Sequence, residues 1–237
     1  MSAPTAGAIV VAGGAGERLG RPGGKQLAEL AGRPVLAWAV ESLDASPAIG
    51  FIVIVCHPER VDTYRLAVEA AIRIDKPHVF VAGGDTRQAS VAAGLAQIPS
   101  PIEIVVVHDG ARPIVSPDLF SDAIAKLRSV TADGLVVGYP SADTIKQVDG
   151  DVVIGTPDRA RLWAVQTPQV FRAESLRRAH RAAASSGYTG TDDASLVEHD
   201  GGTVIVFQGP RDNLKVTVTD DLALAEALMA LRHEGEQ

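Results

Sequence analysis

Short apolar runs alternate with longer amphipathic segments along most of this chain. Continuous aliphatic runs are typical of parallel strands that are buried on both faces, whereas apolar positions with a helical repeat indicate helices. The runs predict strands over 8–12, 51–56, 78–82, 102–107, 134–138, 163–166 and 203–208, and the periodic segments predict helices over 34–45, 59–72, 86–97, 117–128, 173–186, 192–199 and 220–233. This repetition predicts a single α/β domain over residues 1–237, with an open, mostly parallel, Rossmann-like sheet.

The repeating pattern breaks at Ser141. Residues 143–156 form two short runs of alternating polarity around Asp149 and Gly150, which is a strong signal for a β-hairpin. An isolated hairpin is marginally stable in water, so this projecting arm, about residues 141–160, needs a surface to pack against. We therefore expect the arm to lie on a second subunit and to form a homodimer.

The composition excludes several classes of protein. The chain has 237 residues, 46% of them hydrophobic, and its formal charge of −7 leaves no basic excess for binding nucleic acid or an anionic membrane. No apolar run is long enough to span a membrane, and the first run is needed as a strand, so we expect neither a membrane span nor a signal peptide. Cys56 is the only cysteine, and its place at the end of an apolar run predicts a buried, unreactive thiol. We expect a cytoplasmic enzyme.

The first predicted strand leads into a loop that is rich in glycine. Glycines allow several backbone N–H groups to converge on one anion, and cations in the same loop add positive charge. The loop therefore predicts a site for a triphosphate. The residues concerned are Ala12, Gly13, Gly14 and Gly16, followed by the cations Arg18 and Lys25.

Two familiar phosphate-binding motifs do not fit this loop. A Walker A loop has Ser or Thr after its Gly-Lys pair, where this chain has Gln26. A dinucleotide-binding fingerprint has a third glycine where this chain has Leu19. The remaining alternative is a tight connection between a strand and a helix, and the spacing of the two cations favours phosphate binding over it.

Polar clusters also follow later strands, at the carboxyl ends where open α/β sheets bind ligands. Gly84 and Asp85, with Ser90 one helical turn further on, can present donors and acceptors to the edge of a base; a helix cap by Asp85 is the alternative. Asp109 and Arg112 are costly to bury unless they pair with each other or bind a ligand, and we favour the ligand.

Three more cations lie near predicted strand ends in the second half of the chain. Arg159 and Arg161, beside the hairpin, can each bind a phosphate through two N–H groups, and Lys215 would add a further cation near the glycine-rich loop. The sequence shows no Ser–His pair that would indicate a nucleophile. His108 has no partner that the sequence reveals, so we assign it no role.

Taken together and in chain order, these motifs resemble the family of 2-C-methyl-D-erythritol 4-phosphate cytidylyltransferases of the non-mevalonate isoprenoid pathway. Three positions depart from the family's usual pattern, because glycine stands at Gly13, Gly24 and Gly110 where the family has alanine or proline. The motifs that carry the resemblance are the glycine-rich loop with its two cations, Gly83-Gly84-Asp85-x-Arg87, His108-Asp109-x-Ala111-Arg112-Pro113, Asp143-Thr144-Ile145-Lys146, Thr167-Pro168-Gln169, Thr191-Asp192-Asp193-Ala194-Ser195 and Asp212-Asn213-x-Lys215-Val216-Thr217.

The resemblance implies transfer of CMP from CTP to a polyol phosphate, with release of pyrophosphate. It assigns the cytosine to Gly84, Asp85 and Ser90, and the ribose to Asp109 and Gly110. The expected catalytic cations are Arg18 and Lys25 at the α-phosphate, Lys215 at the second substrate, and Arg159, delivered by the arm to the neighbouring subunit. The second substrate is expected at Thr144, Thr167 and Thr191, with Arg112 nearby.

Chemistry of this kind needs no protein nucleophile, because a phosphate monoester is itself competent at neutral pH. We expect Mg²⁺ as the cofactor, held mainly by phosphates, with Asp109 as the candidate protein ligand. The alternatives are a pentitol-phosphate (ribitol 5-phosphate) cytidylyltransferase, a sugar-1-phosphate nucleotidyltransferase with another base, and a non-catalytic nucleotide sensor. The intact cations Arg18, Lys25 and Lys215 argue against the last of these.

Overall fold

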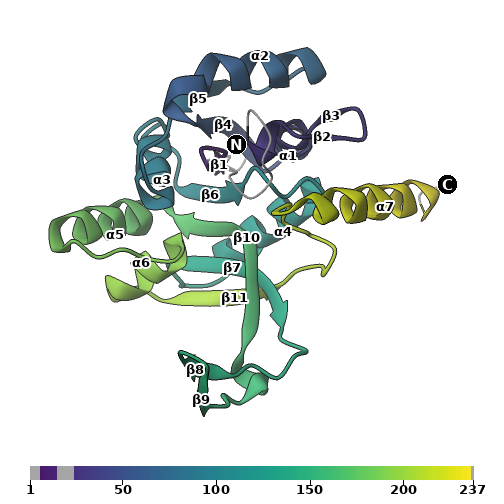
Figure 1. The fold of residues 1–237 in the computed structure, drawn as a ribbon. Coiled ribbons are helices and arrows are strands. Elements are labelled where there is room, and N and C mark those ends of the chain that lie inside the picture. Colours follow the sequence, from purple (N-terminus) through teal and green to yellow (C-terminus); the bar gives the residue numbers. More distant parts are fainter. Residues whose placement is uncertain (1–5, 15–23, 236–237) are drawn as a thin grey trace.

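The fold is built on one seven-stranded sheet, seen in a computed structural model that describes residues 6–14 and 24–235 (Figure 1). Its strand order is β11-β7-β10-β6-β1-β4-β5, and only β10 runs antiparallel to its neighbours. The mostly parallel α/β sheet predicted from the sequence is thus confirmed. The strands are β1 (Ala6–Val11), β4 (Ile49–Cys56), β5 (His78–Ala82), β6 (Ile104–Asp109), β7 (Gly134–Pro140), β10 (Trp163–Arg172) and β11 (Val204–Gln208).

Helices cover both faces of this sheet, which is why its strands are continuously apolar. In β1, Ala8 and Val10 lie in one core layer and Ile9 in the other, and all three are fully buried. The first layer is completed by α1 (Val35–Ala45), α2 (Val61–Ala71) and α4 (Pro117–Arg128), and the second by α3 (Arg87–Leu95), α5 (Ala173–Ser186) and α6 (Asp193–His199).

A smaller apolar cluster holds the C-terminal part of the chain against the sheet. Helix α7 (Thr219–Gly235) packs there against the short strand β2 (Glu29–Leu30), which pairs with β3 (Arg33–Pro34). Val216 is fully buried in this cluster, and its N–H donates to the Ala111 carbonyl oxygen over 2.8 Å. The segment that carries Lys215 is thereby fixed near the end of β6.

Strand β10 is longer than the sequence pattern predicted. The predicted strand stopped at residue 166, before Pro168, but β10 continues to Arg172 and pairs with β6 through Gln169–Arg172. The proline lies where the register with β7 shifts, between Val165 and Gln169, so its missing N–H interrupts no regular ladder. Val170 and Phe171, both fully buried, then continue the strand into the core.

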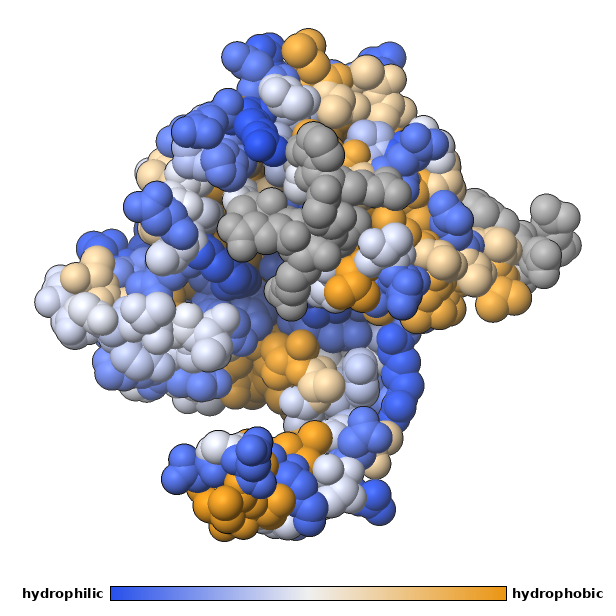
Figure 2. All heavy atoms as spheres, in the orientation of Figure 1, coloured by the Kyte–Doolittle hydropathy of each residue, from blue (hydrophilic) through white to orange (hydrophobic). Residues whose placement is uncertain are grey.

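The arm is a two-stranded hairpin that projects from the sheet between the end of β7 and the start of β10 (Figure 1). Its strands are β8 (Gln147–Asp149) and β9 (Val152–Gly155), and the turn between them uses Gly150 at a φ of 55°, which favours glycine. Val148, Val152 and Ile154 are 54%, 66% and 60% exposed. Figure 2 shows a hydrophobic patch at the tip of the arm, separated from the body of the molecule by an open gap.

None of the helices within residues 6–14 and 24–235 combines the length and the apolar character that crossing a membrane requires.

Cys56 is expected to resist alkylation in the native protein. Its side chain is fully buried, and burial raises the pKa of the thiol to about 12. Because the thiolate is the reactive form, we expect iodoacetamide at mildly alkaline pH to modify the native chain about 10³-fold more slowly than the chain in denaturant. Mass spectrometry over a time course measures both rates, and similar rates would contradict the buried, inert thiol.

Candidate active site

A cavity of about 540 Å³ opens at the carboxyl ends of four adjacent parallel strands. This is the edge at which open α/β sheets bind ligands. Its lining comes from segments that directly follow these strands: Gly13 and Gly14 after β1, His57 to Glu59 after β4, Gly84 to Arg87 after β5, and Asp109 at the end of β6. Lys25 and Lys215 reach the same cavity from elsewhere in the chain.

The structure describes the two ends of the glycine-rich loop, up to Gly14 and from Gly24 onward. Gly13 and Gly14 line the cavity, and the Ala12 N–H donates to the Val55 carbonyl oxygen over 2.7 Å, which holds the start of the loop on β4. Gly16 and Arg18 lie outside the described residues. At the other end, Gly24 has a φ of 78°, a conformation that favours glycine. It leads directly into the short helix η2 (Lys25–Leu27), which places Lys25 at the cavity.

The turn after β5 brings together the residues predicted to read a base. Thr86, and not Asp85, caps α3, because its hydroxyl accepts the Ala89 N–H over 3.0 Å. The helix-cap alternative for Asp85 is therefore wrong, and its exposed side chain stands at the cavity. The Ser90 hydroxyl accepts the Gly84 N–H over 3.2 Å, so Ser90 shapes the turn that presents Asp85.

Asp109 is the electrostatic centre of the cavity. One carboxylate oxygen lies 2.6 Å from the Lys215 ammonium nitrogen, and the other lies 3.7 Å from Nε of Arg87. Burial by itself would raise the pKa of this carboxyl, but the two cations outweigh it and lower the pKa to about 2. Asp109 is therefore ionised at neutral pH, and it holds Lys215 in place beside the cavity.

Arg112 and Gly110, which follow Asp109 in the chain, are not part of the lining of the cavity. Arg112 is 8% exposed and does not line the cavity; its guanidinium donates to the Asn213 carbonyl oxygen over 2.6 Å. It therefore anchors the segment leading to Lys215, and its expected place near the second substrate stays a prediction. Gly110 faces the core, where a Cβ would come within 2.7 Å of Leu36 Cδ1, so close packing explains the glycine.

Thr167 and His108 form a buried hydrogen-bonded unit beneath Asp109. The Thr167 hydroxyl accepts the Asp109 N–H over 3.0 Å and lies 3.1 Å from Nδ1 of His108. Nε2 of His108 faces the Arg112 carbonyl oxygen, which only accepts, so Nδ1 is the acceptor for Thr167. Burial lowers the pKa of His108 to about 4, which keeps the ring neutral. Thr167 thus orients the Asp109 backbone in this chain, and its expected contact with the second substrate stays a prediction.

Three other predicted substrate residues stay outside the cavity of a single chain. Thr144 and Arg159 are exposed on the arm, where the Arg159 guanidinium makes one long bond, 3.4 Å, to the Ala142 carbonyl oxygen. Thr191 is exposed just before α6, which is capped by Asp192 in a capping box with Ser195. The described cavity thus gathers Lys25 and Lys215 but leaves Arg159 apart.

Comparison with known proteins settles the family. The model of the family described as 2-C-methyl-D-erythritol 4-phosphate cytidylyltransferase matches residues 6–231. The chain belongs to this family. Proteins of that name from Prochlorococcus marinus (strain MIT 9313) and Thermosynechococcus vestitus are 43% and 41% identical to it, covering 94% and 97% of this chain and 98% and 97% of their own length.

Solved structures agree with this assignment. The crystal structure of 4-diphosphocytidyl-2C-methyl-D-erythritol synthase from Anaerococcus prevotii superposes with a TM-score of 0.83 at 28% identity and covers 96% of both chains. The 2-C-methyl-D-erythritol 4-phosphate cytidylyltransferase from Thermus thermophilus gives a TM-score of 0.73 at 29% identity, over 94% of this chain and 98% of that one. The resemblance drawn from the motifs is therefore confirmed.

The residues at the cavity include a candidate ligand for the Mg²⁺ ion expected from the sequence. Among residues 6–14 and 24–235, no three side chains of His, Cys, Asp or Glu gather as a metal site. Mg²⁺ prefers oxygen ligands and often takes them from substrate phosphates and water. The ionised Asp109 carboxylate at the cavity fits one such oxygen ligand.

Two residues at the site make contacts that were not predicted from the sequence. Arg87 lines the cavity and contacts both Asp109 and Asp193, and Asn213 holds the strand ends together by donating to the Thr167 carbonyl oxygen over 2.8 Å. The available signal for Arg87 was its place in the sequence: it is a charged residue that closely follows the Gly83-Gly84 pair, at the start of α3. Its partner Asp193 lies 106 residues further along the chain, so no local pattern links the two.

Proposed function

We propose that this chain transfers CMP from CTP to 2-C-methyl-D-erythritol 4-phosphate, forming 4-diphosphocytidyl-2-C-methyl-D-erythritol and pyrophosphate. The observation that carries this proposal is the convergence of Lys25, Lys215 and Asp85 on one cavity at the carboxyl ends of the sheet, in a chain of the cytidylyltransferase family. The relatives named after this activity match the chain over nearly their whole length.

The reaction is an in-line displacement at the α-phosphorus. An oxygen of the substrate's phosphate monoester forms a bond to the α-phosphorus, and the bond from that phosphorus to the bridging oxygen of the β-phosphate breaks, so pyrophosphate leaves with the electron pair. No proton has to be removed from the attacking oxygen. Catalysis then rests on positioning and on neutralising the charge that develops on the phosphoryl oxygens.

The residues at the cavity divide this work between them. Lys25, beside Gly13 and Gly14, neutralises charge at the α-phosphate, and the sequence places Arg18 in the same loop. Lys215 turns from Asp109 toward the phosphates. The turn at Gly84 and Asp85 reads cytosine through backbone groups and one carboxylate. Mg²⁺ bound to the triphosphate would add positive charge there, with Asp109 as its protein ligand.

The arm completes the site in a homodimer. Arg159 and Thr144 lie on an arm that stays away from the cavity of its own chain, and the arm's apolar side chains are exposed. A twofold partner whose arm crosses over would bring both residues to the second substrate. We place this reaction in the cytoplasm, with neither nucleic acid nor a membrane as a partner.

A pyrophosphate-release screen tests the function. Purified chain with Mg²⁺ is offered CTP, UTP or ATP, each with methylerythritol 4-phosphate or ribitol 5-phosphate. We expect CTP with methylerythritol 4-phosphate to give the highest kcat/KM, by about 10²-fold or more over the other nucleotides, because a site that hydrogen-bonds a base rejects one that leaves its groups unpaired. Equal turnover of the three nucleotides would contradict base reading at Asp85. Preference for ribitol 5-phosphate would identify the alternative enzyme.

A further inference from the structure

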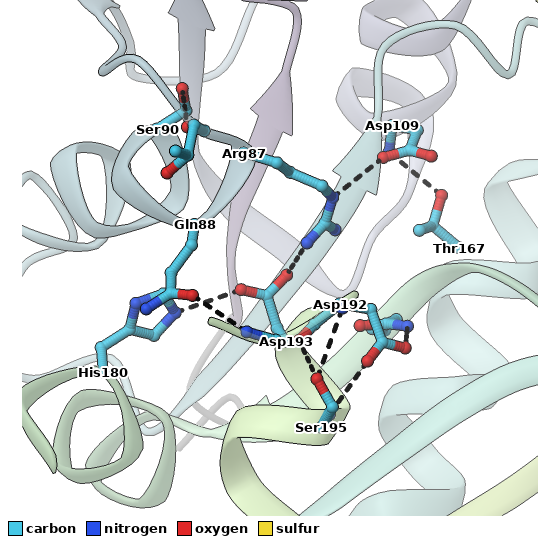
Figure 3. A network of polar contacts seen from close by, with 12 residues as sticks. Arg87, Gln88, Ser90, Asp109, Thr167, His180, Asp192, Asp193 and Ser195 are labelled. Carbon is cyan, nitrogen blue, oxygen red and sulfur yellow. Dashed lines mark hydrogen bonds and ion pairs between the residues drawn. The ribbon is translucent and has the colours of Figure 1, made fainter. Parts of the chain in front are cut away.

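Arg87 links the cavity to a buried part of the molecule that the reaction does not reach (Figure 3). The residue begins α3, and its guanidinium extends between two carboxylates. Nη1 donates to Asp193 over 2.6 Å, and Nε lies 3.7 Å from Asp109. Burial opposes the charge of Arg87, but Asp193 and Asp109 together raise its pKa, so the guanidinium stays protonated.

The Asp193 end of this bridge is rigid. Asp193 is fully buried at the start of α6, and its second carboxylate oxygen lies 3.1 Å from Nε2 of His180 on α5. The next residue along α3, Gln88, accepts the Gly190 N–H over 3.2 Å and donates to the Tyr188 carbonyl oxygen over 3.2 Å. Helices α3, α5 and α6 are therefore tied together around Asp193, so Arg87 is held in one orientation.

The Asp109 end is shared with a cation that can move. Each oxygen of the Asp109 carboxylate faces one cation: Arg87 on one side and Lys215 on the other. The Lys215 side chain is 38% exposed and has a flexible stem, whereas the Arg87 guanidinium is held by Asp193. If Lys215 turned to a phosphate and Arg87 were absent, the buried Asp109 carboxylate would have no protein counter-ion. Whenever no metal ion was bound, it would be an unpaired buried charge, which is strongly unfavourable.

We infer that Arg87 is a positioning residue: it fixes Asp109 and remains as its counter-ion when Lys215 turns to the phosphates of the substrates. This inference rests on the proposed function, because it uses the role given there to Lys215. The two cations that contact Asp109 then have different roles. Lys215 acts on the substrates, and Arg87 keeps the charge of Asp109 balanced whether or not Lys215 is engaged.

The first test compares Arg87→Gln with a matched control. Arg178→Gln removes another arginine–carboxylate contact next to α6, the 2.6 Å pair with Asp200, which touches neither Asp109 nor the cavity. We expect Arg87→Gln to lower kcat/KM for pyrophosphate release by about 10- to 100-fold, as misplacement of a reacting group does, and Arg178→Gln to leave it unchanged. Wild-type turnover by Arg87→Gln would overturn the inference.

A double variant separates positioning from simple structural support. Arg87→Gln alone leaves the buried Asp193 charge without its arginine, so part of its effect can come from folding. Arg87→Gln with Asp193→Asn removes both charges. If Arg87 acts through Asp109, this double variant stays as slow as the single one although its thermal stability recovers. Recovery of turnover together with stability would overturn the inference.

A double-mutant cycle with Asp109→Asn gives the direct measure of coupling. We expect Arg87→Gln to cost less than about threefold in kcat/KM when Asp109 is already Asn, because the charge it balances is gone. An undiminished loss in that background overturns the inference. If Arg87→Gln alone does not fold, the double variant Arg87→Gln with Asp193→Asn, which leaves no unpaired charge at Asp193, takes its place in the same cycle. If the proposed function itself is wrong, the wild-type chain shows no turnover in the same assay. That result overturns both the proposed function and the inference about Arg87.

Discussion

Lys25→Ala is expected to lower kcat by about 10²–10³-fold while leaving the fold intact. Removing one preorganised charge donor from a site where negative charge develops typically has an effect of this size. Lys25 begins η2 and lines the cavity beside Gly13 and Gly14, so it is positioned before the substrate arrives. The loss should fall mainly on kcat rather than on KM for CTP, because the charge it neutralises grows in the transition state.

The control for this variant is a lysine far from the cavity. Lys126 is exposed on α4 and takes no part in the lining, so Lys126→Ala should keep wild-type turnover. Pyrophosphate release gives kcat and KM for both variants, and thermal unfolding shows whether each is folded. Asp221, whose pKa Lys25 helps to lower, still accepts the Thr217 N–H and hydroxyl, so the start of α7 should hold. Unchanged kcat in folded Lys25→Ala protein would remove Lys25 from the chemistry.

The sheet was predictable because a strand that is buried on both faces is made almost entirely of apolar residues. Strands such as β4 and β6 are nearly uninterrupted runs of aliphatic residues, and their order along the chain with the intervening helices implies a parallel sheet. The end of β10 was not predictable in this way. Pro168 usually ends a strand, and only the register shift that accommodates it shows that the strand goes on.

The site was predictable in its residues but less so in their partners. The sequence indicates that Asp109 and Arg112, both at the end of a buried strand, need compensation. It does not say that Asp109 pairs with Lys215 and Arg87 while Arg112 binds the Asn213 carbonyl oxygen, since these contacts join distant segments. The local sequence shows which charged side chains would be costly to bury. Only the folded structure shows which groups pair with them.

Gly110 illustrates the same limit on a smaller scale. From the sequence, Gly110 is seen only as a departure from the alanine that the family usually has at this position, beside the expected ribose site. In the structure a Cβ at this position would press on Leu36 Cδ1 at 2.7 Å, with Val10 Cγ1 at 3.1 Å. The glycine therefore matches how closely α1 packs on β1 and the end of β6 in this chain, which the sequence alone does not reveal.

Two inactive variants, Lys25→Ala and Arg159→Ala, are expected to restore activity when their subunits exchange. The cavity of one chain holds Lys25, whereas Arg159 lies on the arm and outside that cavity. Val148, Val152 and Ile154 are each more than half exposed on the arm, and leaving one such side chain in water forgoes ~1.5–3 kcal/mol. Burial of these side chains on a twofold partner favours an arm that crosses between subunits.

The expected amount of restored activity follows from the symmetry. Random exchange makes about half of the dimers mixed, and each mixed dimer has one intact site, built from Lys25 of one chain and Arg159 of the other. Turnover should then rise to about a quarter of the wild-type value. The matched control replaces Lys25→Ala with the double variant Lys25→Ala/Arg159→Ala, whose mixed dimers with Arg159→Ala contain no intact site. Mass spectrometry of tagged subunits confirms that exchange has occurred in both mixtures. If subunits exchange and the first mixture stays as inactive as the control, each site is built within one chain, and the arm does not carry Arg159 to its neighbour.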